Sequence, residues 1–228
     1  MNFSSNTIKN IVLKSSFGSK GNGFNFAHFN PGSLLSNFDE FKSIINNVPL
    51  DLIGISESWL KEKHGDHLIS ISDYNIIRKD RSGRRAGGVL LYINKGIKYK
   101  IIKKNATSSK FDMVFAELSN DNFEKLLVGV VYIPPKVKSL NNLKQFLIDI
   151  VTKYNDILIL GDFNCNLRCN SPYVLRFKAF LNSIGLNPAS SEPTNFINGS
   201  STCIDLLLIK NQAKLGFYTQ LAVPELYT

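Results

Sequence analysis

The sequence predicts a layered α/β fold that contains a mixed β-sheet or two packed sheets. A run of four branched aliphatic residues, Ile157 to Leu160, leads into Gly161-Asp162-Phe163-Asn164 and is typical of a buried strand. Many strand candidates follow one another without a helix between them, whereas parallel neighbours need a crossover connection. A few stretches with helical spacing of apolar residues supply helices for the outer layers.

The strand candidates are short apolar or alternating stretches that end at polar residues, glycine or proline. The candidate that ends at Tyr132 is followed by Pro134-Pro135, which cannot continue a hydrogen-bonded ladder. In chain order the candidates cover residues 23–29, 50–56, 74–79, 89–93, 98–103, 112–118, 125–132, 157–160 and 203–209.

Helices are expected where apolar residues recur every three or four positions. Ser36 or Asn37 is suited to begin the first of them, because Asp39 and Glu40 then fall in its first turn. The stretches are residues 34–45, 140–151 and 174–184.

The chain of 228 residues is long enough for one large domain with a full core. Residues 1–22 are rich in Asn, Ser, Lys and Gly and lack an apolar signal core, so they are expected to form a flexible tail. No repeat or linker interrupts residues 23–209, and we therefore assign residues 23–228 to a single domain.

Polar side chains recur where strand candidates end, the usual place for ligands in open α/β sheets. Asp162 and Asn164 stand two residues apart, so a continuing extended backbone points both to one side. A carboxylate can accept a proton or hold a cation, and an amide can donate to a phosphate oxygen. Asp205 lies in an apolar strand candidate, where a buried carboxylate needs a partner. The other members of the group are Asn30, Glu57 and Tyr132.

Each of these residues also has a purely structural interpretation. Asp162 is equally well explained as a turn residue that ends a strand, and Asn30 before Pro31 is a common turn element. Glu57 fits a solvated loop, and Tyr132 fits the core or its rim. The convergence of all six residues is what favours a functional cluster.

The charge balance favours an anionic partner, with nucleic acid first. The 27 Lys and Arg residues exceed the 18 Asp and Glu residues by 9, and the pI is about 9.4. A loop at residues 78–88 carries much of this charge, although a solvated turn explains it too. The arginines of this loop are Arg78, Arg81, Arg84 and Arg85, Lys79 lies among them, and Lys103 and Lys104 follow later.

The chain contains no apolar run long enough to span a membrane, and it is not expected to be secreted. Cys165, Cys169 and Cys203 lack the paired spacing of a zinc site and are expected to be reduced thiols of an intracellular protein.

In its ordered motifs the sequence resembles the endonuclease domain of non-LTR retrotransposons of the jockey-like type. This domain belongs to the endonuclease/exonuclease/phosphatase superfamily, together with apurinic endonucleases and type I deoxyribonuclease. The matching segments are residues 25–30, 33–34, 53–60, 78–81, 87–89, 131–135, 160–164, 193–194 and 202–205.

The resemblance implies a four-layer sandwich, with two mixed sheets between outer helices. It also implies a phosphodiesterase that depends on Mg²⁺ or Mn²⁺ and nicks target DNA for retrotransposition. The implied partners are DNA and a reverse-transcriptase region of the same polyprotein, which this chain does not include. A DNA substrate further implies access to the nucleus.

Matching positions carry over the family's residue roles. Glu57 would bind the metal with help from Asn30, and Asp162 would orient or deprotonate the attacking water. Asn164 and Tyr132 would contact the scissile phosphate. Thr194 would lie at the DNA surface, and Asp205 would hold a catalytic histidine. Apart from the resemblance, the positive charges of Arg81, Arg84 and Arg85 suit them to contact DNA phosphates.

Two departures from the family pattern affect activity. Family members place the catalytic histidine soon after a segment like Val223-Pro224-Glu225-Leu226, but Tyr227 and Thr228 stand there. The resemblance therefore predicts an incomplete domain without this histidine and without its last strand. Asn30 is also followed by Pro31-Gly32, where the family has an aliphatic and then a basic or amide residue.

Two alternative functions remain open from the sequence. One is a non-catalytic DNA-binding or interaction module that keeps the fold and the positive charge. The other is a phosphatase of the same superfamily that acts on a phospholipid or inositol phosphate. The sequence around Trp59, Arg81 and Gly87-Gly88 matches retrotransposons better than such phosphatases.

Overall fold

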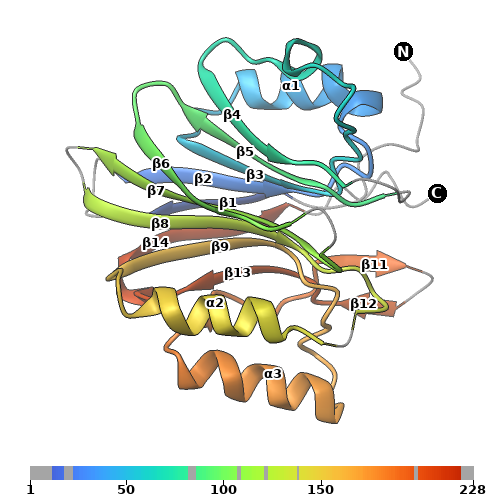
Figure 1. Ribbon diagram of the computed structural model, residues 1–228, viewed down its shortest axis with the longest axis vertical. Coiled ribbons are helices and arrows are strands. Elements are labelled where there is room, and N and C mark those ends of the chain that lie inside the picture. Colours follow the sequence, from blue (N-terminus) through green and yellow to red (C-terminus); the bar gives the residue numbers. More distant parts are fainter. Residues whose placement is uncertain are drawn as a thin grey trace.

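The computed structural model describes residues 12–17, 23–81, 86–106, 109–120, 123–137, 139–197 and 200–221. Within these ranges two six-stranded sheets pack face to face, with helix α1 outside the first sheet and helices α2 and α3 outside the second (Figure 1). The predicted four-layer sandwich is therefore confirmed. No helix in the described ranges is long and apolar enough to cross a membrane.

The first sheet has the strand order β14-β1-β2-β3-β5-β4. Strands β2 and β3 are parallel and the other neighbours are antiparallel, so this sheet is mixed as predicted. Its strands are β14 (Leu215–Leu221), β1 (Val12–Phe17), β2 (Phe24–Phe29), β3 (Leu52–Ser56), β5 (Val89–Asn94) and β4 (Tyr74–Lys79).

Strands β1 and β14 correct the sequence-based prediction. Residues 1–22 were expected to form a flexible tail, but Val12–Phe17 pairs with both β2 and β14 inside the first sheet. Strand β14 was not predicted at all. Neither segment has the continuous apolar run of a central strand. Strand β1 forms by pairing with β2, and β14 forms at the edge of the sheet by pairing with β1.

The second sheet has the strand order β10-β13-β9-β8-β7-β6, and only β8 and β9 are parallel among its paired strands. A short hairpin of β11 (Asn195–Ile197) and β12 (Ser200–Thr202) lies beside it. The strands of this sheet are β10 (Asn187–Pro188), β13 (Asp205–Ile209), β9 (Asp156–Asp162), β8 (Phe123–Tyr132), β7 (Asp112–Asn120) and β6 (Lys98–Lys104).

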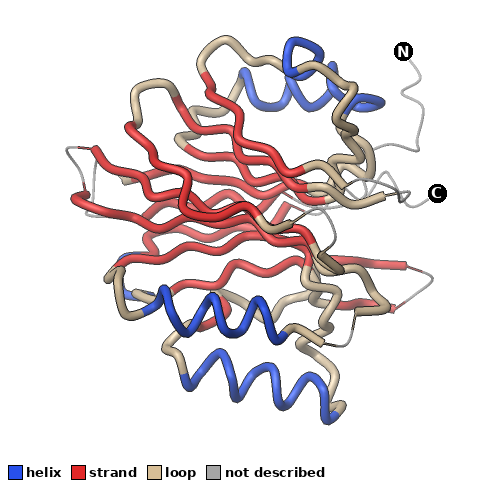
Figure 2. Tube along the Cα trace, in the orientation of Figure 1, coloured by secondary structure: helices blue, strands red, loops and turns tan. Residues whose placement is uncertain are grey.

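The helices lie close to their predicted positions and cover the outer faces of the sheets (Figure 2). Asn37 occupies the N-cap position of α1, and Asp39 and Glu40 lie in its first turn as predicted. The helices are α1 (Phe38–Asn46), α2 (Asn141–Val151) and α3 (Pro172–Ser183), with 3₁₀ turns at Leu35–Asn37, Asp66–Ile69 and Gln212–Lys214.

The central strand β9 is apolar on both faces because each face meets a different core layer. Ile157 and Ile159 pack with residues of α2 and α3, whereas Leu158 and Leu160 pack between the two sheets. A strand buried on both sides reads as an unbroken aliphatic run, which is why it could be recognised in the sequence. Its carboxyl end delivers Asp162 to the end of the sandwich.

Candidate functional site

Four polar side chains form a row across the second sheet. The register pairs Asp112 of β7 with Tyr132, Tyr132 with Asp162, and Asp162 with Asp205 of β13. Residues paired across strands share one face of a sheet. Residues two positions away, Val114, Val130, Leu160 and Leu207, all lie in the core between the sheets, so the row faces the first sheet.

The first sheet contributes two residues that meet this row. Asn30 follows β2, and its Nδ2 donates a hydrogen bond of 3.2 Å to Oδ2 of Asp162. Glu57 follows β3, and its carboxylate accepts a hydrogen bond from the Tyr132 hydroxyl. The structure therefore brings Asn30, Glu57, Tyr132, Asp162 and Asp205 together between the sheets.

Asn164 lies beside Asp162 in a different orientation from the expected one. Its backbone N–H donates to Oδ1 of Asp162 at 2.9 Å, and its side-chain Nδ2 donates to the Ile133 carbonyl at 2.9 Å. The strand ends at Asp162 and Asn164 has φ of 45°, so the alternation of an extended backbone does not continue. The amide fixes the loop after β9 and holds the Asp162 carboxylate through its backbone.

Gly161 is required by the close approach of β8. It has φ of 147°, and a Cβ at this position would lie 1.8 Å from the Val131 carbonyl oxygen. Any side chain would push β9 away from β8 and displace the neighbouring Asp162 from the row.

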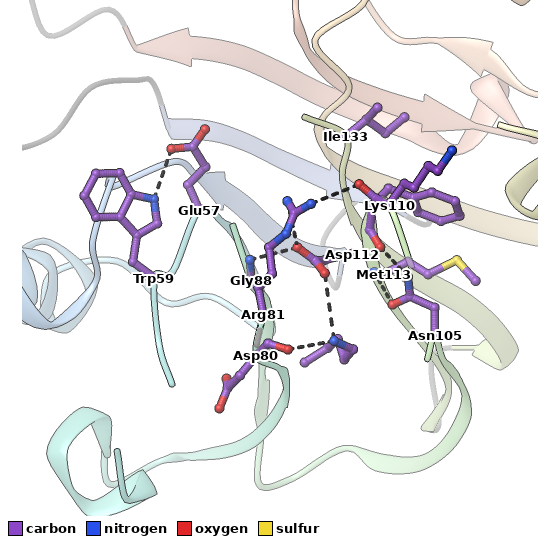
Figure 3. Close-up of polar contacts among 12 residues, drawn as sticks. Glu57, Trp59, Asp80, Arg81, Gly88, Asn105, Lys110, Asp112, Met113 and Ile133 are labelled. Carbon is purple, nitrogen blue, oxygen red and sulfur yellow. Dashed lines mark hydrogen bonds and ion pairs between the residues drawn. The ribbon is translucent and has the colours of Figure 1, made fainter. Parts of the chain in front are cut away.

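The segment that carries Glu57 has a strained backbone. Glu57 has φ of 52° and Trp59 has φ of 53°, values that are uncommon for residues with a Cβ. Backbone N–H groups of Ser58 and Trp59 donate to the carbonyls of Gly88 and Gly87 at 3.2 and 2.9 Å. These bonds hold the segment in place, and the Trp59 indole N–H donates to Oε2 of Glu57 at 3.2 Å (Figure 3).

Asp112 is the member of the row that the sequence analysis missed. Its side chain is 1% exposed and accepts from the Gly88 N–H at 3.0 Å. Its oxygens lie 3.6 Å from Arg81 Nη1 and 3.9 Å from Lys79 Nζ (Figure 3). No motif marks Asp112, and only its place opposite Tyr132 associates it with the site.

Arg81 was predicted to contact DNA from a flexible, positively charged loop, but it is only 9% exposed. Its Nη2 donates to the Lys110 carbonyl at 3.0 Å, and its guanidinium carbon lies 5.9 Å from the centre of the Tyr132 ring. This prediction is corrected, because Arg81 packs as a buried cation against Tyr132. Arg84 and Arg85, predicted to bind DNA too, lie outside the described residues.

Thr194 was expected at the DNA surface, and the structure corrects this as well. It is 1% exposed, and its Oγ1 accepts from the backbone N–H groups of Ile204 and Asp205, each at 3.0 Å. Thr194 therefore anchors the start of β13 and so the backbone of Asp205.

The two buried carboxylates of the row share an environment that disfavours charge. Burial is the main cause that raises the pKa of Asp205 to about 7, and the nearby Thr194 hydroxyl opposes the shift. Burial, followed by repulsion from Asp205, also raises the pKa of Asp162. Neither oxygen of Asp205 has a hydrogen bond of normal geometry to the described part of the chain. The Asp205 carboxyl group, with a pKa of about 7, is suited to give and take a proton at neutral pH.

The free energy of unfolding of the wild-type chain is expected to fall as the pH rises from about 4 to 7, and that of Asp205→Asn is expected to fall less. The folded chain holds a proton on Asp205 that the unfolded chain has released above the ordinary pKa of 3.8, so wild-type stability falls through this window. Asparagine does not ionise, and the variant lacks this contribution. Urea unfolding in EDTA at pH 5 and pH 8 measures the difference. The same pH dependence in both chains would contradict the assigned pKa.

Two of the histidines have local partners, and the cysteines are not paired with one another. His28 is buried, its Nε2 is 3.0 Å from the Ser56 hydroxyl, and burial lowers its pKa to about 3. His64 accepts from the Lys61 N–H in an outer loop. All three cysteines are free thiols, as expected.

The Glu57 carboxylate is a ligand that fits magnesium better than zinc. Within the described ranges, no three His, Cys, Asp or Glu side chains are grouped to hold a metal ion. Zinc sites need three or four such ligands, whereas Mg²⁺ keeps several waters and uses one or two carboxylates with substrate phosphate. Glu57 supplies one such carboxylate next to the Tyr132 hydroxyl, which fits the magnesium requirement.

Comparisons with known proteins identify the family and the fold. The profile of the Endonuclease/Exonuclease/phosphatase family matches residues 23–225, and no curated protein matches the chain. An AP endonuclease from Leishmania major has a TM-score of 0.64 at 10% identity over 83% of this chain and 79% of its own. A 3'-5' exonuclease from Neisseria meningitidis has a TM-score of 0.61 at 16% identity over 81% and 86%.

An AP endonuclease from Archaeoglobus fulgidus also shares the fold, with a TM-score of 0.59 at 11% identity over 82% of this chain and 86% of its own. At these identities the solved structures establish the fold alone. Enzymes of this family are hydrolases, either nucleases or phosphatases, and they generally depend on a divalent metal, typically Mg²⁺. The family match spans most of the chain, and the chain therefore belongs to the endonuclease/exonuclease/phosphatase family.

Proposed function

We propose that this chain is the endonuclease domain of a jockey-like non-LTR retrotransposon and that it hydrolyses a phosphodiester bond to nick DNA. The observation that carries the proposal is the meeting of Asn30, Glu57, Tyr132 and Asp162 between the two sheets, linked by the hydrogen bond from Asn30 to Asp162. The ordered retrotransposon-like motifs and the net charge of +9 support a nucleic-acid substrate.

The chain's own residues supply most of what phosphodiester hydrolysis requires. Asp162, with its raised pKa and its orientation fixed by Asn30, is placed to accept a proton from the attacking water. The Tyr132 hydroxyl is placed to donate to a phosphate oxygen once Glu57 takes another partner. Mg²⁺ held by Glu57 and Asn30 would polarise the phosphoryl group.

The test is nicking of supercoiled plasmid DNA by the purified chain in Mg²⁺ or Mn²⁺. We expect conversion to open circles that stops in EDTA and is strongly reduced in Glu57→Gln. None of the three histidines is bonded to Asp205 in the described structure, so the rate is expected to be low and the assay needs excess protein. Nicking that persists in EDTA, or in Glu57→Gln at the wild-type rate, would contradict the proposal.

A second candidate is a DNA-binding module without catalysis, which the unpartnered carboxylate of Asp205 favours. It predicts DNA binding that weakens steeply between low and physiological salt, with no cleavage in any metal. Phosphatase activity is the third candidate, since the similar folds include a 2',3'-cyclic phosphatase, ANGEL2. Phosphate release from lipid or inositol substrates, compared with nicking, separates it from the nuclease.

The proposed partners are DNA and a reverse-transcriptase region of the same polyprotein. A DNA target in chromosomes also leads us to propose an intracellular protein with access to the nucleus.

A further inference from the structure

Trp59 is a large aromatic side chain left partly open to solvent beside the candidate active site. Trp59 is 36% exposed, whereas the residues on either side, Ser58 and Leu60, are buried. Its indole N–H donates to the Glu57 carboxylate at 3.2 Å, so the ring edge lies against the proposed metal ligand (Figure 3). The exposed ring therefore forms part of the rim of the site.

The fold holds this ring at the rim at an energetic cost. The φ of 53° at Trp59 is a left-handed conformation that bulky residues rarely adopt, and such strain costs about 1–3 kcal/mol. The hydrogen bond from the Trp59 N–H to Gly87, together with the buried side chains of Ser58 and Leu60, fixes the backbone in this conformation. Strain of this kind persists where a side chain is needed in a particular place.

We propose that Trp59 stacks against the nucleotide next to the phosphate that reacts at Glu57. This inference rests on the proposed function and names its substrate class, which is nucleic acid with an unstacked or unpaired base at the nick. A phosphate that reaches Glu57 carries its neighbouring sugar and base past the adjoining indole. Aromatic rings at such positions bind bases of any sequence through their flat faces.

The chemistry of the surroundings favours a nucleotide over a lipid. The chain has a net charge of +9, and a single indole beside an acidic, hydrogen-bonded site offers little apolar area for insertion into a bilayer. A nucleotide can use both features of this site, because its base can stack on the flat indole ring while its phosphate occupies the neighbouring site at Glu57.

Trp59 is the only tryptophan of the chain, so its fluorescence reports on this position alone. The experiment titrates the Asp162→Asn variant in Mg²⁺ with single-stranded DNA, and with a strand of equal length whose sugars lack bases. We expect strong quenching by the first and weak quenching by the second. Equal quenching by both strands, or a response to anionic phospholipid vesicles and not to DNA, would overturn the proposal.

Binding of labelled single-stranded DNA, measured by anisotropy in the same Asp162→Asn background, provides the quantitative test. Trp59→Ala is expected to weaken binding about 5- to 150-fold, as loss of one stacked base does. Trp59→Phe keeps a ring but loses the N–H bond to Glu57, so it should retain most of the affinity. Leu175→Ala, at a side chain 50% exposed on α3, is the matched control and should bind normally.

The outcomes separate this inference from the proposed function. If plasmid nicking occurs and Trp59→Ala binds within about twofold of its parent, the stacking role is wrong and the nuclease proposal stands. If no nicking occurs in any metal but binding still depends on an aromatic residue at position 59, the stacking role stands without catalysis. Loss of affinity in Trp59→Phe equal to that in Trp59→Ala would assign the effect to the N–H bond and overturn stacking.

Discussion

Asp162→Asn is expected to lower the rate of plasmid nicking by about two to four orders of magnitude, the range for loss of a positioned proton acceptor. The substitution keeps the size of the side chain, and its one oxygen can accept from either the Asn30 amide, which bonds to Oδ2, or the Asn164 N–H, which bonds to Oδ1. It removes the negative charge and the ability to take a proton. The open-circle product, quantified over time in Mg²⁺, measures the effect.

A matched control exists on the same strand. Asp156 stands at the opposite end of β9, where it pairs with Lys214, far along the strand from the row of polar residues. Asp156→Asn should therefore nick at the wild-type rate. If both variants lose activity equally, the effect comes from the fold and the proposed role of Asp162 is wrong.

Asp112→Ala is expected to lower the free energy of unfolding by about 3–5 kcal/mol, the usual result when one partner of a buried ion pair is removed. Arg81 and Lys79 would then be buried cations without their common carboxylate, and the Gly88 N–H would lose its acceptor. Urea unfolding at neutral pH measures the change.

A second substitution tests whether the buried charges of Arg81 and Lys79 cause the loss of stability in Asp112→Ala. Replacing Lys79 by methionine in the Asp112→Ala background removes one uncompensated charge and should recover part of the lost stability. A loss of less than about 1 kcal/mol for Asp112→Ala alone would show that the charges of Arg81 and Lys79 reach solvent.

Asp112 holds Arg81, and Arg81 packs on the Tyr132 ring. We therefore also expect slower nicking by chains that carry a substitution at Asp112 and remain folded.

Strands and helices with a strong local pattern were predicted correctly. The apolar run before Gly161 was recognised as a buried strand, and the structure extends this strand through Gly161, which contacts the Val131 carbonyl, to Asp162. The strand candidates that deliver Asn30, Glu57 and Tyr132 were recognised from their apolar patterns, and these side chains do meet. The errors concern residues whose surroundings come from distant segments, such as Thr194 and Arg81.

By itself the sequence determined the layered α/β class, the central strands, the helices and the candidate cluster of oxygen ligands. These features follow from periodicity and from polar residues at strand ends, which are local properties of the chain. Only the tertiary structure placed β1 and β14 in a sheet, buried Thr194 and Arg81, and added Asp112 to the row. Burial and cross-strand register depend on contacts between segments far apart in the chain, and no local pattern encodes them.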